Sequence, residues 1–153
     1  MNRHLTQDAL LLLQAELSPI AGIQLSFEAE EGDRLLAILD GFEMDARRRI
    51  CLAGLYIILT EAARSHMKCN RDDQDLVRNV LDGDYLYSFY LQFAIQHREL
   101  DLVAFLAPYV KRQQIARSCG QDGETDYAGL IGQYLVKEFK KSGRPAKAIE
   151  QVG

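Results

Sequence analysis

One segment limits the possible folds of this chain more than any other. Residues 85–95 read YLYSFYLQFAI, and nine of these eleven residues are apolar or aromatic. A helix at the surface of a monomer buries one stripe and leaves the other in water. A helix that is apolar nearly all round must therefore lie at the centre of the fold or in a subunit interface. Because Tyr and Phe are enriched in interface cores, we favour the interface, and the central position stays open.

Helical periodicity extends along almost the whole chain and predicts an all-α domain. Leu5, Ala9, Leu13 and Leu17 share one face of a first helix, which Ser18-Pro19 ends because proline has no backbone donor. Five more helices are expected over residues 33–42, 45–67, 72–97, 100–118 and 124–141.

Single residues refine these boundaries. Asp33 and Asp45 are expected to cap the second and third helices, since aspartate accepts hydrogen bonds from free amides at an N-terminus. Pro108 is expected to kink or split the fifth helix. Residues 23–27 alternate weakly and could be extended, and residues 142–153 are expected to form a flexible tail.

Composition narrows the class of protein. The chain has 153 residues with 48% hydrophobic and 26% charged residues, which predicts one globular domain over residues 1–153. A net charge of −4 argues against nucleic-acid binding. The first 45 residues carry two basic and nine acidic residues, which indicates a solvated face or a surface for a basic partner.

The apolar runs and the cysteines indicate the cellular compartment of the protein. The longest apolar run, residues 52–59, is far shorter than the roughly 20 residues of a membrane span, and the N-terminal residues lack the pattern of a signal peptide. Cys51, Cys69 and Cys119 form no CxxC pair and are expected to be reduced, buried thiols. We therefore expect a cytoplasmic protein without a membrane span.

Two groups of residues suggest metal binding. His66 and Cys69 form a single H-x2-C pair, whereas zinc needs three or four ligands. Asp72, Asp73 and Asp75 could hold Mg²⁺, but carboxylates at this place are also expected at a helix N-terminus, where they face free backbone donors. We favour the structural role and expect no metal site or cofactor in this chain.

The segment LDGDYLYS, residues 81–88, opens the aromatic helix. It resembles the helix start of the trans-polyprenyl diphosphate synthases, in which a DDxxD helix comes before the GDYL helix. The matching stretch here, residues 56–64, reads YIILTEAAR, and Glu61 is its only acidic residue. Residues 45–141 are more similar to the small, non-catalytic component I of heteromeric hexaprenyl and heptaprenyl diphosphate synthases. GETDYAGLIGQYLVKEF, residues 123–139, resembles the helix that closes that shortened bundle. Residues 1–44 lie outside the resemblance.

The resemblance implies a truncated isoprenoid-synthase-like bundle of about six helices without activity of its own. A catalytic large subunit would carry the aspartate motifs and Mg²⁺, and would make a medium-chain polyprenyl diphosphate for a quinone side chain. The small subunit would stabilise it and help to set product length by lining its tunnel. The residues expected at the interface or tunnel, about half of which could equally be core, are Tyr56, Ile57, Leu59, Tyr85, Phe89, Tyr90 and Phe93.

Two residues of the motif have expected structural roles. Gly83 would allow close helix approach or the turn into the helix, and Asp84 would act as a cap or hydrogen-bond anchor rather than as a metal ligand. Two other functions stay open. One is a helical homodimeric adaptor or regulator that self-associates through the aromatic helix. The other is a metal-dependent diphosphate enzyme that uses Asp84 with the aspartates of residues 72–75.

Overall fold

The computed structural model describes residues 3–68, 75–121 and 123–143, and these residues form six α-helices and no strand. The predicted all-α class and the number of helices are therefore confirmed. The helices are α1 (Arg3–Glu16), α2 (Asp33–Leu39), α3 (Ala46–Met67), α4 (Leu76–Gln96), α5 (Leu100–Ser118) and α6 (Tyr127–Ser142). Two short 3₁₀ turns, η1 (Pro19–Ala21) and η2 (Ala29–Gly32), lie between α1 and α2.

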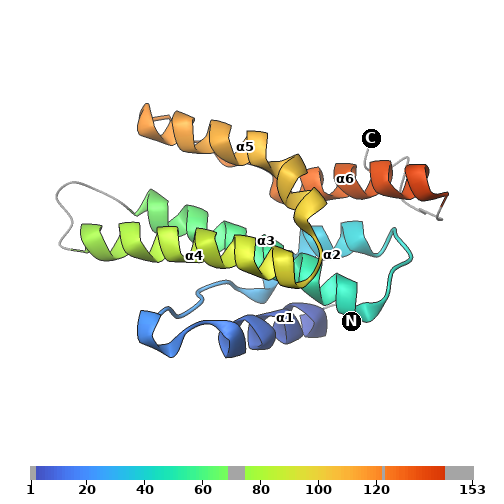
Figure 1. Cartoon of the computed structure of the whole chain (residues 1–153), viewed down its shortest axis with the longest axis horizontal. Helices are drawn as coiled ribbons and strands as arrows, with labels where there is room; N and C mark the ends of the chain where they lie inside the picture. The colour runs from blue at the N-terminus through green and yellow to red at the C-terminus, as the bar shows by residue number, and fades with distance from the viewer. Residues whose placement is uncertain (1–2, 69–74, 122, 144–153) are drawn as a thin grey trace.

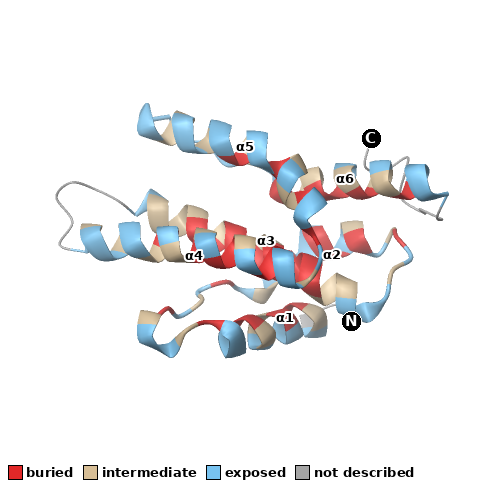
Figure 2. Cartoon of the chain, in the orientation of Figure 1, coloured by how far each residue is buried: buried red, intermediate tan, exposed pale blue. Residues whose placement is uncertain are grey.

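Helix α3 forms the centre of the fold (Figure 1). It begins after Asp45, whose carboxylate accepts a hydrogen bond from the Arg48 amide at 2.7 Å, as predicted for an N-cap. Ten of its 22 residues are buried, and they occupy nearly every face of its middle turns. α4 packs along one side of α3 and α1 along another, so α3 is covered by neighbours where its sequence is apolar all round (Figure 2).

The close approach of α4 to α3 depends on small residues. Gly54 of α3 faces the Phe93 ring of α4, and a Cβ atom built on Gly54 would lie 3.1 Å from the Phe93 Cζ atom. A larger side chain at Gly54 would push the two helices apart or displace the ring. The aromatic residues of α4 therefore pack against the backbone of the central helix.

Helices α5 and α6 form a second layer. α6 packs on α2, and Phe42, just after the end of α2, meets Phe139 edge to face with the ring centroids 5.1 Å apart. The first half of α5 crosses α6 and α4, whereas the second half extends away as an exposed arm (Figures 1 and 2). The three buried residues of α5 all lie in the first eleven residues of that helix: Leu102, Leu106 and Val110.

Some expected boundaries and contacts differ from the structure. α2 ends at Leu39 rather than at residue 42, and Gly32 rather than Asp33 occupies its N-cap. Pro108 does not split α5, which runs unbroken from Leu100 to Ser118. Both Pro108 and Ala104, whose carbonyl loses its amide donor, are exposed, so water can satisfy that carbonyl.

The cysteines also differ in part from expectation. Cys51 is a buried free thiol, but Cys119 is exposed at the end of α5, which corrects the prediction that the thiols are buried. Cys69 lies outside the described residues, as does most of the tail expected over residues 142–153. Among the helices that the structure describes, none is both long enough and apolar enough to cross a bilayer.

Candidate functional site

The inner face of α4 belongs to the core of this chain. Phe89, Tyr90 and Phe93 are at most 6% exposed and pack toward α3. Ile57 and Leu59 of α3, predicted at an interface or tunnel together with them, are buried in the same core. Five of the seven predicted residues thus lie in the interior of the single chain, where they are not available to a partner without rearrangement.

The opposite face of α4 is largely exposed to solvent in the described chain. At 100° per residue, Val77, Leu81 and Ile95 point directly away from the core face, and they are 70%, 61% and 60% exposed. We call this face the outer stripe; its residues are Val77, Leu81, Asp84, Ser88, Leu91 and Ile95. Isolated exposed apolar residues are ordinary, but three on one helix face, Val77, Leu81 and Ile95, form a candidate interaction surface.

The motif residues Gly83 and Asp84 join α4 to the end of α3. A Cβ atom on Gly83 would overlap the imidazole ring of His66, so a larger residue at this position must displace the ring. His66 Nε2 lies 3.1 Å from Asp84 Oδ1. In the sequence, His66 stands out only as half of a metal pair, because spacing along the chain does not reveal a partner on another helix.

Tyr85 ties α4 to the turn after α1. Its hydroxyl accepts a hydrogen bond from the Ser18 amide at 3.0 Å, and its ring stacks on Phe89 with centroids 6.4 Å apart. Beside it runs a shallow groove of about 550 Å³ that Ala21, Ile23 and the start of the outer stripe line. Tyr85 is half-buried and borders the exposed surface, unlike the five core residues.

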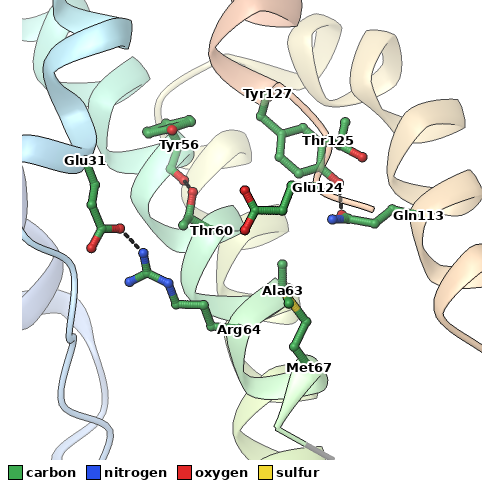
Figure 3. Close-up of a pocket in the computed structure, with 10 residues that line it drawn as sticks. All are labelled: Glu31, Tyr56, Thr60, Ala63, Arg64, Met67, Gln113, Glu124, Thr125 and Tyr127. Atoms are coloured by element: carbon green, nitrogen blue, oxygen red, sulfur yellow. Dashed lines mark hydrogen bonds and ion pairs between the residues drawn. The ribbon is translucent and has the colours of Figure 1, made fainter. Parts of the chain in front are cut away.

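Tyr56, the seventh predicted residue, lines a cavity of about 340 Å³ between α3, η2 and the connection from α5 to α6 (Figure 3). Burial raises the pKa of its phenol, and the nearby Asp126 carboxylate raises it further. The other residues that line this cavity are Glu31, Thr60, Ala63, Arg64, Met67, Gln113, Glu124, Thr125 and Tyr127.

Glu61 is the only acidic residue where the synthases would carry DDxxD, and it has a structural position here. It is 5% exposed. Its carboxylate accepts hydrogen bonds from the Ser26 amide at 3.1 Å and from Arg64 at 2.9 Å. Arg64 also pairs with Glu31. Glu61 therefore fixes the extended segment before η2 to the central helix, a role that only the tertiary contacts reveal.

A second ion-pair network joins α3, α5 and α6. Arg48 donates to Glu99 at 2.8 Å and to Glu138 at 2.7 Å. Burial alone would lower the pKa of the Arg48 guanidinium, but the hydrogen bonds to both carboxylates raise it overall. These charges line a polar cavity of about 610 Å³ and satisfy one another, so they stabilise the packing of the second layer.

The described ranges contain no group of three or more His, Cys, Asp or Glu residues placed to hold a metal ion. Asp75 occupies the N-cap of α4, although its side chain accepts no capping hydrogen bond there. Cys69, Asp72 and Asp73, the remaining candidates from the sequence, lie outside the residues that the structure describes.

The chain has no significant counterpart among known families or structures. No protein-family model matches it, and no solved structure matches it.

Proposed function

We propose that this chain is the non-catalytic accessory subunit of a heteromeric trans-polyprenyl diphosphate synthase. The observation that carries the proposal is the position of LDGDYLYS, residues 81–88, on α4. The inner face of that helix packs on α3, whereas Val77, Leu81 and Ile95 of its outer stripe are apolar and exposed. The motif lies inside α4, which begins at Leu76, so Gly83 and Asp84 form neither the turn into the helix nor its cap. The helix that contains the motif thus offers a surface suited to another subunit.

The outer stripe, rather than the aromatic core, is the surface we assign to the partner. α4 has 21 residues and is therefore roughly 30 Å long, which is enough to form the centre of a standard protein–protein interface. The buried rings of Phe89, Tyr90 and Phe93 act indirectly, because they hold α4 rigidly against α3. The accessory chain would influence product length if the side chains of Leu81, Leu91 and Ile95 close part of the partner's tunnel.

The chemistry belongs to the partner in this proposal. An allylic diphosphate ionises only when metal ions neutralise the leaving group, and the resemblance assigns the aspartates and Mg²⁺ to the large subunit. The accessory chain lowers the free energy of the active conformation of that subunit by binding it preferentially. The chain then needs no catalytic residue of its own.

A helical homodimeric adaptor is the second candidate, and the outer stripe also favours it. A C2 dimer would bury the stripe of one copy against that of another. Mass measurement by light scattering separates the two candidates. The chain is mixed with a full-length synthase of the same genome that carries two DDxxD motifs. A mixed complex supports the accessory subunit, whereas a homodimer that ignores the synthase supports the adaptor.

A further inference from the structure

The cavity beside Tyr56 has the size of a small-molecule site and is open to solvent on one side. Its volume of about 340 Å³ falls within the usual range of ligand pockets, about 300–1,000 Å³. α3 forms its floor with Thr60, Ala63 and Met67, and the connection between α5 and α6 covers it (Figure 3). The proposed interaction through the outer stripe does not use this cavity.

Two aromatic rings stand on opposite sides of the cavity (Figure 3). Tyr127 is 5% exposed, and its hydroxyl donates to the Gln113 side chain, which holds the ring in place. Tyr56 meets Phe27 edge to face with centroids 5.9 Å apart. Both rings are therefore held in place before any ligand binds, so binding between them costs little conformational entropy.

The charges around the cavity leave a negative balance. The only cation among its lining residues, Arg64, is neutralised by Glu31 and by Glu61, which lies 2.9 Å away. Nearby Arg34 is engaged by Asp126 at 2.6 Å. Glu124 is exposed at the edge of the cavity, where its carboxylate forms no hydrogen bond or ion pair within the described chain and points toward Thr60 (Figure 3).

We propose that this cavity binds a small organic cation that consists of an ammonium group and a short apolar substituent. The ammonium lies between the electron-rich faces of Tyr56 and Tyr127 and pairs with Glu124. The substituent rests on Ala63 and Met67. An anion would meet the unpaired Glu124 and an arginine that is already saturated, so the site discriminates against negative ligands.

Phenethylammonium, neutral 2-phenylethanol and anionic phenylacetate share one ring and differ in charge, which makes them suitable probes. Each is titrated into the full chain at neutral pH and low salt, followed by calorimetry and by amide chemical shifts. Phenethylammonium should bind about tenfold more tightly than 2-phenylethanol, with shifts centred on α3 and residues 123–127. Phenylacetate should bind more weakly than either.

Two variants and a control locate the site. Glu124→Gln should weaken phenethylammonium by about fivefold, and Tyr56→Leu by a similar factor. Glu43→Gln changes an exposed carboxylate outside the cavity and should leave binding unchanged. Equal affinity for the three probes, an undiminished affinity in Glu124→Gln, shifts centred elsewhere, or no binding at millimolar concentrations would each overturn the proposal. These outcomes are independent of whether the chain pairs with a synthase.

Discussion

The imidazole ring of His66 lies against the backbone of Gly83, and its Nε2 atom is 3.1 Å from the carboxylate of Asp84. One ring from the last turns of α3 thus contacts both motif residues at the start of the aromatic segment of α4. A Cβ atom at position 83 would occupy the space of the ring, so the ring keeps this position only beside glycine. This contact gives two residues of LDGDYLYS a structural role in setting how α4 lies on α3.

Gly83→Ala should destabilise the chain because the new methyl group must displace the His66 ring. We expect a loss of about 1–3 kcal/mol in the free energy of unfolding, even though alanine favours helix. Urea denaturation measures it. The double variant Gly83→Ala/His66→Ala should recover most of the loss, and Gly123→Ala, which meets only open space, should stay within about 0.5 kcal/mol. Equal stability of Gly83→Ala and wild type would refute this contact.

Replacement of Glu61 tests whether the buried carboxylate is structural. Glu61→Ala leaves the Ser26 amide without its acceptor and Arg64 with only Glu31, so we expect a loss of about 2–4 kcal/mol. Glu31→Gln removes the more exposed partner of Arg64 and should cost less than about 1 kcal/mol. Unfolding curves that show the same loss for both variants would contradict the assignment.

The ion pair between Arg34 and Asp126 predicts that the stability of the chain falls at acidic pH. Hydrogen bonding from Arg34 lowers the pKa of the Asp126 carboxyl below its ordinary value. The stabilisation that this ion pair provides is therefore complete above the ordinary aspartate pKa of about 3.9. It is lost as the pH falls through the lowered pKa of Asp126. Both side chains are largely exposed, so the effect is small.

Asp126→Asn isolates this charge, because asparagine can still accept the capping bond from the Gly129 amide of α6. Denaturation midpoints measured from about pH 6 down to about pH 2 should fall less steeply for Asp126→Asn than for wild type. Arg34→Gln should flatten the curve in the same way. Parallel curves for all three proteins would show that the pair makes no pH-dependent contribution.

Substitutions on the outer stripe test where a synthase subunit binds. Leu81→Glu places a charge on the exposed face of α4, and it should weaken the complex by about tenfold or more without unfolding the chain. Leu11→Glu is the matched control, because Leu11 is also an exposed leucine, 70% exposed, on α1. Surface plasmon resonance against the synthase measures both. Similar affinities for the two variants would move the interface away from the outer stripe.

Helical periodicity predicted the class, the order of the helices and most of their cores. Asp45 and the proline after Ser18 mark boundaries through local chemistry, so the sequence reveals them. The environment of α4 was less predictable. Apolar residues lie on both sides of the helix, aromatic on the core face and aliphatic on the outer stripe, and periodicity cannot tell a core face from an exposed one when both are apolar.

The sequence does not reveal sites that are built from residues far apart in the chain. Tyr56 and Glu124 are 68 positions apart, yet the connection between α5 and α6 brings them to one cavity. His66 and Asp84 meet only because α4 runs along α3. Spacing rules describe one helix or loop at a time, so contacts of this kind require the tertiary structure.

Prenyl transfer, measured with Mg²⁺, farnesyl diphosphate and isopentenyl diphosphate, decides whether the chain is an accessory subunit. The chain is assayed alone, the candidate large subunit alone, and the two together, and the products are separated by length. We predict no product from this chain alone, and from the mixture a rate or chain length that the large subunit does not reach alone. Product from this chain alone, or a mixture that behaves as the large subunit does, would contradict the proposed function.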